Sequence, residues 1–511
     1  MYYFLDNRLD PKSSGIEHAE IKRLRLFHQL GEKAQLVMCD FNRFAHDNLR
    51  LYGLTDDDYI NMFDYFAGTV HYPARDLTIS HLSIDQTSHI SQRTHGYEVS
   101  EGNRKTLFIN LMPNSEQINT VKYFNGDGNC TKQDFYDTRG FKSLTQFYAT
   151  NKQELVYEQF YKPNGAIYYE ISYEQRPNWL AATNIQLINF TGKNYSLMNI
   201  GEAFTIMLDH LNQNDGDKLS TFISDRSNIT NLPMINMKTP ARKIEHFHNI
   251  HFRDYWDPMN SPLTYPSVAD TDLLRQTDLV IVPTPQQAAD MKERLKTQVP
   301  IVAIPVGIVP DQQLNAPRIT FQKRQPGKII AVARLFYEKR LDDAIKAFAK
   351  AHKRIPNLTL DIYGYGDGSD NYKEEKMLKA LTQELQLTDF VHFKGYQTDM
   401  RAVYNSAQLM IMSSRYEGAP LSIIEAQSHG VPVISYNTHY GPAYLIRNGV
   451  SGNIVPDGNV NALADSIITY FRDPRLQVAM SKNAYENAAR FSSDQVWQSW
   501  QKYVINGADL F

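Results

Sequence analysis

The stretch Lys328-Ile-Ile-Ala-Val-Ala-Arg-Leu-Phe-Tyr-Glu-Lys-Arg-Leu341 sets the pattern of the C-terminal half of the chain. Its apolar start predicts a buried strand over residues 328–335, and the spacing of apolar residues beyond it predicts a helix over 341–355. The same alternation continues downstream. We expect strands at 358–363, 391–393, 409–413 and 432–435, and helices at 374–387, 400–407 and 420–428. Strands that alternate with helices in this way predict a parallel, doubly wound α/β sheet.

Ligands of such a sheet bind at the carboxyl ends of its strands. This rule directs attention to residues 334–339, 364–368, 395–396 and 413–420, and it makes Gly364 and Tyr396 candidates for ligand binding. Within the first range, Arg334 and Lys339 can together neutralise a diphosphate, because arginine offers a planar fork and lysine a point charge. The alternative interpretation is a solvated Glu-Lys-Arg turn.

The second candidate group is Arg415-Tyr-Glu-Gly-Ala-Pro-Leu-Ser-Ile-Ile-Glu425. Pro420 suits the first position of a helix. Gly418 and Ala419 allow a close approach of the backbone to a ligand, and the amides that begin the helix, at Leu421 and beyond, can bind an anion. The alternative interpretation is an ordinary helix start that contains an incidental acid.

Two glutamates bracket this group. Glu425 lies inside the predicted helix, about 7–8 Å along its axis from the start. It should therefore not share one substrate atom with Glu417. The two carboxylates suit opposite ends of an extended ligand, a sugar at Glu417 and a ribose at Glu425.

Histidines are concentrated in Glu245-His-Phe-His-Asn-Ile-His251. The i, i+3 relation of His248 and His251 permits a zinc site, but the sequence offers no obvious third ligand nearby, so we expect no metal. Core or surface histidines are the commoner outcome. A separate small-residue loop, Ser13-Ser-Gly-Ile-Glu17, precedes a helix predicted over 16–30, and the amide of Gly15 could contact a phosphate there.

The N-terminal half has a different texture between residues 70 and 195, where Tyr, Phe, Thr and Asn dominate. Turn signals at 124–129 and 163–165 predict β-hairpins. We interpret this block as a β-rich insertion, either an oligomer or acceptor surface or a half-buried sheet that packs on the core. Just before it, Thr55-Asp-Asp-Asp58 resembles a capping box for a helix over 59–66.

Bulk properties exclude several classes of protein. The chain has 511 residues and a net charge of −3, which predicts two or three domains and no nucleic-acid partner. The first residues do not resemble a signal peptide, and the longest apolar runs fall well short of the roughly 20 residues that span a bilayer. Cys39 and Cys130 are expected to be reduced and structural in a cytoplasmic protein. Work at the inner face of the membrane remains open.

The order of these motifs resembles that of a known enzyme family. Arg334 and Lys339, then Tyr363-Gly-Tyr-Gly366, then Glu417-x7-Glu425 resemble the GT-B-fold retaining glycosyltransferases of family 4. The resemblance implies two Rossmann-like lobes facing a cleft. It also implies that Arg334 and Lys339 bind the donor diphosphate, that Glu425 binds the ribose hydroxyls, and that Glu417 and the amides after it hold the sugar. Two further implications are that His248 faces the sugar and that no metal is needed.

The opening of the chain resembles one branch of this family. Residues 14–20, 40–43 and 61–65, together with the insertion, resemble bacterial poly(glycerol-phosphate) α-glucosyltransferases of wall teichoic acid, a branch that includes the glycosyltransferases of serine-rich repeat adhesins. It implies a UDP-glucose or UDP-N-acetylglucosamine donor, a teichoic acid or glycoprotein acceptor, and a homo-oligomer through the insertion. A catalytically inactive acceptor-binding partner and a nucleotide-sugar epimerase are the alternatives.

The expected division follows from these features. We expect the N-terminal lobe at 1–69 and 196–310, the insertion at 70–195, the donor-binding lobe at 311–490, and a terminal helix returning to the N-terminal lobe at 491–511.

Overall fold

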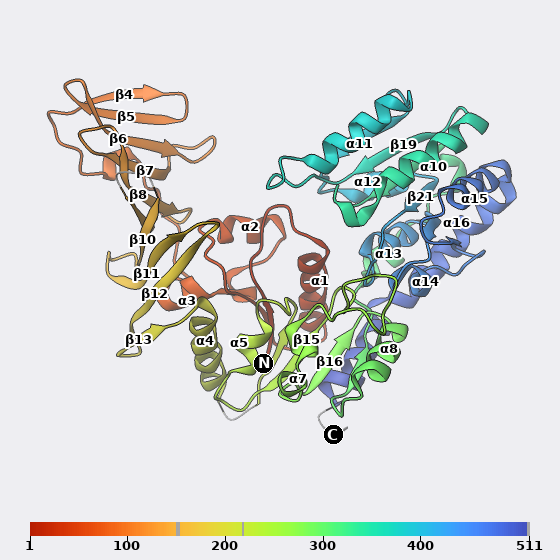
Figure 1. The fold of residues 1–511 in the computed structure, drawn as a ribbon, viewed down its shortest axis with the longest axis horizontal. Helices are drawn as coiled ribbons and strands as arrows, with labels where there is room; N and C mark the ends of the chain where they lie inside the picture. The colour runs from red at the N-terminus through yellow and green to blue at the C-terminus, as the bar shows by residue number, and fades with distance from the viewer. Residues whose placement is uncertain (150–153, 217–218, 508–511) are drawn as a thin grey trace. The chain divides into compact units, whose positions relative to one another are not determined.

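The computed structural model describes residues 1–149, 154–216 and 219–507 (Figure 1). The chain forms two compact units. The first unit comprises Met1–Ser13 and Glu32–Lys243, and the second comprises Ser14–Gly31 and Ile244–Phe511. This division differs from the expected lobe boundary near residue 310, and it groups the first long helix with the C-terminal part of the chain. The two compact units are defined by contacts within the chain and not by lobe, so the expected lobe limits stay a prediction.

A parallel sheet lies at the base of the first unit. Strand β1 (Tyr2–Asp6) pairs with β14 (Thr221–Ser224) on one side and with β2 (Ala34–Met38) on the other, and β2 pairs with β3 (Tyr59–Asn61). Phe4 and Leu5 are fully buried, as the central strand of such a sheet requires. The helices of this part are α2 (Ala45–Leu51), α3 (Met62–Ala67), α4 (Ile200–Asn214) and α5 (Asn231–Ile235).

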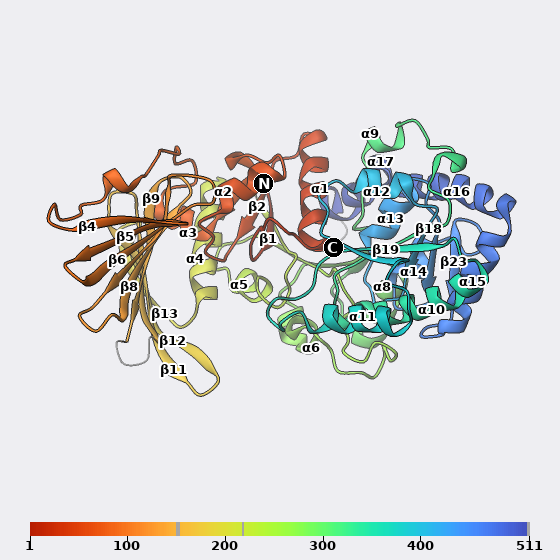
Figure 2. The ribbon, with the colours of Figure 1, turned by 90° about the horizontal axis from the view of Figure 1, so that it is seen from above.

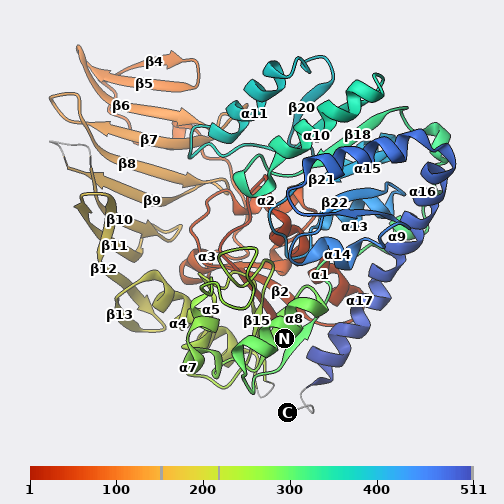
Figure 3. The same ribbon diagram turned by 45° about the vertical axis from the view of Figure 1, so that its right-hand side comes forward.

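The β-rich insertion is confirmed as a ten-stranded antiparallel sheet. Its strands follow one another in chain order, as Figure 3 shows, and Figure 2 views the same strands from above. The predicted turns at 124–129 and 163–165 join β7 to β8 and β10 to β11. The strands are β4 (His89–Arg93), β5 (Gly96–Glu101), β6 (Arg104–Leu111), β7 (Ile118–Phe124), β8 (Cys130–Asp137), β9 (Phe141–Tyr148), β10 (Leu155–Tyr161), β11 (Ile167–Arg176), β12 (Trp179–Phe190) and β13 (Lys193–Leu197).

The predicted helix over 59–66 was wrong in its first half. Thr55 and Asp58 do form a capping box, but it closes a single 3₁₀ turn at Asp56–Asp58. Residues 59–61 then form β3, and Asn61 caps the short helix α3 by accepting a hydrogen bond from the amide of Phe63. The capping signal was real, but the sheet takes the residues that follow it because Tyr59 and Ile60 pack as buried strand residues.

The second unit contains the predicted parallel, doubly wound sheet, in the order β20-β19-β18-β21-β22-β23. Alternate residues of β18 face opposite sides: Ile329 packs in one hydrophobic cluster and Ile330 in another. Helices therefore cover both faces of this sheet. Its strands are β18 (Lys328–Val332), β19 (Thr359–Tyr363), β20 (Val391–Gly395), β21 (Leu409–Met412), β22 (Val433–Tyr436) and β23 (Gly452–Val455), and its helices are α10 (Leu341–Arg354), α11 (Lys373–Glu384), α12 (Met400–Ser406), α13 (Leu421–Ser428), α14 (Gly441–Leu445), α15 (Val460–Arg472) and α16 (Pro474–Ala488).

The second unit also contains a shorter parallel group, in which β16 pairs with both β15 and β17. Helix α17 (Ser493–Trp500) packs on α1 (Gly15–Gln29), where Phe27 meets the rings of Trp497 and Trp500 at 5.2 and 5.5 Å between centroids. Among the described residues, every helix is too short or too polar to cross a membrane. The remaining elements are β15 (Arg242–His246), β16 (Leu279–Val282), β17 (Ile301–Ala303), α6 (Pro266–Ala269), α7 (Thr271–Leu274), α8 (Pro285–Leu295) and α9 (Asp311–Leu314).

Candidate active site

Arg334 lies two residues beyond the end of β18, in the loop that leads to α10. Its guanidinium lies 4.3 Å from the ring centroid of Phe336 and donates a hydrogen bond of 3.0 Å to Glu338. The Arg334 side chain is 39% exposed. The prediction that a cation stands at this strand end is confirmed, and Glu338 is its one ion-pair partner among the described residues.

Lys339 and Glu417 form an ion pair, so the structure brings the two halves of the motif together. The Nζ of Lys339 lies 2.8 Å from Oε1 of Glu417, and the hydroxyl of Ser414 donates to the same oxygen at 2.7 Å. The two charged side chains are only 16% and 13% exposed. Each charge is therefore neutralised by the other in a largely buried environment. Leaving either charge unpaired there would cost free energy, whereas replacing one charged partner by another would not.

The loop that bears Glu417 is fixed by its backbone. The amide of Glu417 donates to the carbonyl of His439 at 2.8 Å, and the amide of Tyr440 donates back to the carbonyl of Glu417 at 2.5 Å. A side chain at Gly418 would collide with the backbone carbonyl of His248. The glycine is therefore required by a close approach of the protein's own backbone, whereas the sequence suggested the approach of a ligand.

Helix α13 begins immediately after this loop. Pro420 is its N-cap, with extended backbone, and Leu421 is its first residue, so the expectation of Pro420 at the first helical position was off by one. The first amides of an α-helix have no partner within the helix and carry the positive end of its dipole. The amides that begin α13 at Leu421 can therefore donate hydrogen bonds to an anion beside Glu417.

Glu425 is held by two side chains that sequence reasoning missed. The Nζ of Lys22, on α1, lies 2.7 Å from Oε1 of Glu425, and the hydroxyl of the buried Tyr404 donates to Oε2 at 3.1 Å. Burial alone would raise the pKa of Glu425, but the charge of Lys22 outweighs it and the pKa is lowered. Glu425 is therefore ionised near neutral pH. Lys22 stands four residues after His18 on the same helix, a spacing that carries no ligand signal in the sequence.

Gly15 is the first residue of α1, and open space lies where its side chain would be. Ser14 caps this helix and forms a capping box with Glu17. The structure thus places Gly15 at a helix N-terminus, as predicted from the small-residue loop, and in the same unit as Glu425, which was not predicted. One turn farther along, burial lowers the pKa of His18, although the neighbouring Glu425 acts in the opposite direction. His18 is consequently neutral at pH 7.

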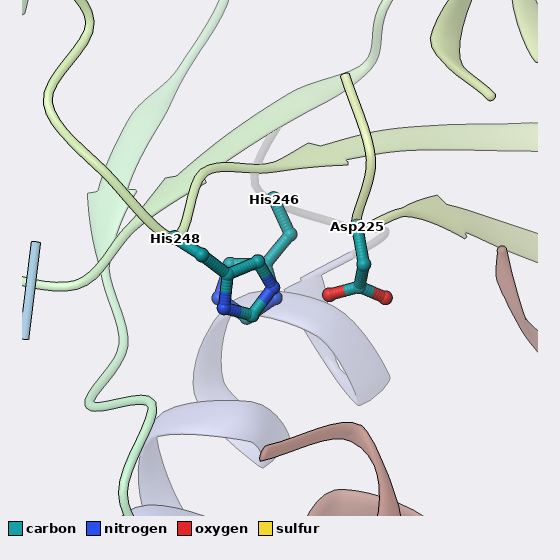
Figure 4. A group of neighbouring side chains, drawn as sticks. All are labelled: Asp225, His246 and His248. Carbon is teal, nitrogen blue, oxygen red and sulfur yellow. The ribbon is translucent and has the colours of Figure 1, made fainter. Parts of the chain in front are cut away.

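The histidines of 246–251 separate into different environments. Figure 4 shows the rings of His246 and His248 side by side, and their centroids lie 4.3 Å apart. Arg23 contacts Nδ1 of His246 at 2.7 Å. His251 is fully buried and parallel to the ring of Tyr440, so its ring exposes no atom to a ligand. His248 is half-buried, and its backbone carbonyl meets the loop of Glu417.

Gly364 and Tyr396 lie at neighbouring strand ends. A side chain at Gly364 would collide with the carbonyl of Ala333, and Gly364 has a backbone φ of +148°, so glycine permits the loop after β19 to lie against the loop of Arg334. The amide of Gly364 donates to the carbonyl of Gly395 at 3.0 Å. Tyr396 meets Tyr365 edge to face, with ring centroids 5.7 Å apart. Three strand-end loops thus meet at one edge, as the topology requires.

Comparison with known proteins gives the class of protein that this fold and site define. Residues 313–487 match the family model described as "Glycosyl transferases group 1". The structure also resembles the crystal structure of the pneumococcal O-GlcNAc transferase GtfA in complex with UDP and GlcNAc, with a TM-score of 0.81, 22% identity, and coverage of 99% of this chain and 98% of that one. Residues 313–487 are therefore similar to the group 1 glycosyltransferases, and the chain has the GT-B fold, as predicted.

Two relatives match over almost the whole chain. The GtfA subunit of the UDP-N-acetylglucosamine–peptide N-acetylglucosaminyltransferase of Streptococcus parasanguinis is 26% identical, with 96% of each chain covered. The poly(glycerol-phosphate) alpha-glucosyltransferase of Bacillus subtilis (strain 168) is 23% identical, with 98% of this chain and 74% of that protein covered. Both similarities extend through the β-rich insertion as well as the group 1 domain.

Proposed function

We propose that this chain is a UDP-sugar-dependent hexosyltransferase that acts on a bacterial cell-surface acceptor. The observation that carries the proposal is the Lys339–Glu417 ion pair at the carboxyl edge of the second unit's sheet, with Arg334 on the same loop as Lys339. Such an edge is where α/β sheets bind ligands. The group 1 match over residues 313–487 and the names of both relatives support the same reaction class.

The proposed roles divide the site along an extended donor. Arg334 and Lys339 neutralise the diphosphate, Glu417 holds the sugar together with the amides at the start of α13, and Glu425 accepts hydrogen bonds from the ribose. Lys339 contacts Glu417 at 2.8 Å in the structure. On donor binding, a phosphate oxygen would take over part of this contact while the sugar hydroxyls become new partners of Glu417. Gly364, Tyr396 and Gly15 border the donor, and His248 faces the sugar.

The proposed mechanism retains the anomeric configuration and needs no metal. The acceptor hydroxyl attacks the anomeric carbon from the face that the diphosphate leaves. The bond from carbon to phosphate oxygen breaks, the bond to the acceptor oxygen forms, and the acceptor proton passes to the leaving phosphate. Arg334 and Lys339 stabilise the charge that develops on that phosphate. This route requires no pair of carboxylates flanking the anomeric carbon, unlike a glycosidase.

The donor sugar is glucose or N-acetylglucosamine, and the first acceptor candidate is poly(glycerol-phosphate) teichoic acid. A protein acceptor, such as a serine-rich repeat adhesin, is the second candidate, because the peptide-modifying relative aligns over 96% of both chains. We further propose that the enzyme works in the cytoplasm at the inner face of the membrane, and that the ten-stranded sheet β4–β13 mediates a homo-oligomer and presents the polymeric acceptor.

A donor and acceptor matrix tests the proposal. UDP-glucose and UDP-N-acetylglucosamine are each incubated with poly(glycerol-phosphate) and with a serine-rich peptide, and UDP release and product mass are measured, with and without EDTA. We expect one hexose or N-acetylhexosamine to be added to one acceptor, at a rate that EDTA leaves unchanged. NMR of the product reads its anomeric configuration. Binding of UDP without transfer in any combination would instead favour an inactive acceptor-binding partner, and the absence of UDP binding would refute the proposal.

A further inference from the structure

Lys22 is the one cation that α1 directs at Glu425 among the described residues. The two residues come from helices that are far apart in sequence, α1 and α13, yet their charged atoms lie 2.7 Å apart. The side chains are 22% and 34% exposed, so the pair is neither sealed in the core nor free in water. An ion pair of this exposure contributes little to stability, typically 0–1 kcal/mol. Its position on the carboxylate assigned to ribose therefore suggests a second role.

The Glu425 carboxylate is oriented from both sides. Lys22 occupies Oε1, and the hydroxyl of Tyr404 donates to Oε2. Because Tyr404 is only 2% exposed, its hydroxyl is a fixed point of the core rather than a mobile surface group. A carboxylate accepts about four hydrogen bonds, two on each oxygen. Two acceptor positions therefore remain among the described contacts, one on each oxygen, which is the arrangement that the adjacent hydroxyls of a ribose would use.

Lys22 also controls the charge of this carboxylate. His18 is neutral at pH 7, so Lys22 supplies the positive charge that α1 brings to Glu425. Hydrogen bonds from hydroxyls to an ionised carboxylate are about twice as strong as those to a neutral acceptor. Without Lys22, the hydroxyl of Tyr404 would be the one remaining side-chain donor to Glu425 among the described residues, and the carboxylate could rotate about that bond.

We propose that Lys22 is a positioning residue of the donor site: together with Tyr404 it holds the Glu425 carboxylate so that it accepts both ribose hydroxyls, and it thereby makes the site prefer a ribonucleotide donor to its 2′-deoxy analogue. The inference rests on the proposed function, since it deepens the role of Glu425. The competing view is that Lys22 merely fastens α1 to α13. That view predicts a loss of stability without any change in ribose discrimination.

Equilibrium binding of UDP and 2′-deoxy-UDP to the full chain distinguishes these views. We expect the wild-type protein to prefer UDP by about tenfold or more, the value of a hydrogen bond to a charged group. Lys22→Met should weaken UDP binding about tenfold and reduce the preference to within about threefold, whereas Lys22→Arg should retain most of it. In turnover assays Lys22→Met should raise KM and leave kcat nearly unchanged. The matched control is Lys482→Met, which removes an exposed ion pair with Glu486 on α16.

A double-mutant cycle separates the effect of Lys22 on Glu425 from a general loss of folding. Glu425→Gln should lose the ribose preference by itself, and adding Lys22→Met should cost little more UDP affinity, because Lys22 acts through Glu425. Tyr404→Phe, which removes only a hydroxyl, should reduce the preference in the same direction. Unchanged ribose discrimination in a folded Lys22→Met protein, or additive losses in the cycle, would overturn the inference alone. A wild-type protein that binds no UDP would overturn the proposed function and this inference with it.

Discussion

Two clusters of charged residues in this molecule have similar compositions and opposite surroundings. In the first unit, Arg139 is 3% exposed and donates to Asp137, to Asp64 and to the carbonyl of Thr69. In the second unit, Arg334 is 39% exposed and pairs with Glu338. Buried polar groups must be saturated within the protein, whereas a ligand site must retain donors for the ligand. The number of unfilled hydrogen-bonding positions, rather than the presence of charge, separates a structural network from a binding site.

The pKa shifts of the buried cluster agree with this interpretation. Burial alone would raise the pKa of Asp64, but its hydrogen bond with His46 and the charge of Arg139 lower it. Burial alone would likewise lower the pKa of His46, and its hydrogen bond to Asp64 reverses the shift. The Asp64–His46 pair thus favours the charged form of both residues, whereas burial raises the pKa of Asp137 despite its hydrogen bonds with Arg139. The cluster joins the β8–β9 turn, which bears Arg139, to α3, which bears Asp64, so it anchors the antiparallel sheet within the first unit.

The largest expected effect is the loss of stability when this anchor is cut. Arg139→Met leaves the carboxylates of Asp64 and Asp137 buried without their shared counter-charge, and should lower the free energy of unfolding by about 3–5 kcal/mol. Denaturant titration of the purified protein measures the change. The control is Arg176→Met, whose ion pair with Glu174 is exposed, and which should stay within about 0.5 kcal/mol of wild type. A loss below about 1 kcal/mol for Arg139→Met would mean that water replaces the guanidinium, contrary to the comparison.

The opposite behaviour is expected of Arg334. Arg334→Ala should reduce kcat/KM by about 10²–10³-fold, because a preorganised charge at the leaving group is lost, and should change stability by less than about 0.5 kcal/mol. Lys346→Ala is the matched control, since Lys346 and Asp342 form an i, i+4 ion pair of similar exposure on α10. Its turnover should equal that of wild type. Near-normal turnover of Arg334→Ala would remove the assigned role in leaving-group stabilisation.

Lys339 lies between these extremes, because its partner Glu417 is only 13% exposed. Lys339→Met should abolish most turnover and also destabilise the protein by about 1–3 kcal/mol, since Glu417 keeps only the hydroxyl of Ser414 as a side-chain donor among the described contacts. Adding Glu417→Gln should recover part of the stability and none of the turnover. Recovery of turnover in the double variant would show that Lys339 acts only by compensating Glu417. Unfolding curves and transfer assays on the same preparations separate these outcomes.

Sequence reasoning succeeded where the relevant contacts are local. The strand at β18, the loop cations Arg334 and Lys339, and the helix α13 follow from apolar spacing within short windows, and the parallel topology then brings the strand ends together. The hairpins of the insertion followed from turn chemistry for the same reason. The sheet edge that carries Arg334 and Lys339 is thus predictable from the sequence.

The failures concern contacts between distant segments. Lys22 approaches Glu425 only because α1 packs in the same unit as α13, and no periodicity within residues 14–31 encodes that neighbour. At Gly418 a side chain would collide with the carbonyl of His248, and this constraint is equally remote in sequence, while the ligand role of Gly418 stays a prediction. The i, i+3 spacing of His248 and His251 permitted a zinc site on paper, because spacing cannot reveal that His251 is buried. In each case the missing information is which non-local segment covers the residue.

The smallest expected effect uses this buried histidine. Burial, with the charges of Arg294 and His439, lowers the pKa of His251 to about 3. The folded state therefore binds fewer protons than the unfolded state below the ordinary histidine pKa of about 6.5. The protonation of this histidine therefore leaves the free energy of unfolding unchanged above about pH 6.5 and lowers it as the pH falls towards 3. The expected decrease between pH 7.5 and 5.5 is about 1 kcal/mol.

The variant His251→Phe should remove this pH-dependent loss. Neither ring nitrogen of His251 has a hydrogen-bond partner among the described residues, and the ring neighbours those of Phe252 and Tyr440, so phenylalanine suits the space and the chemistry. Denaturant titrations at pH 7.5 and 5.5 compare the variant with wild type and with His71→Gln, a change at a largely exposed histidine. An equal pH dependence in His251→Phe and wild type would mean that the ring is protonated in the folded state. In that case, the burial of a side chain would not determine its charge state as strongly as the comparison of Arg139 with Arg334 requires.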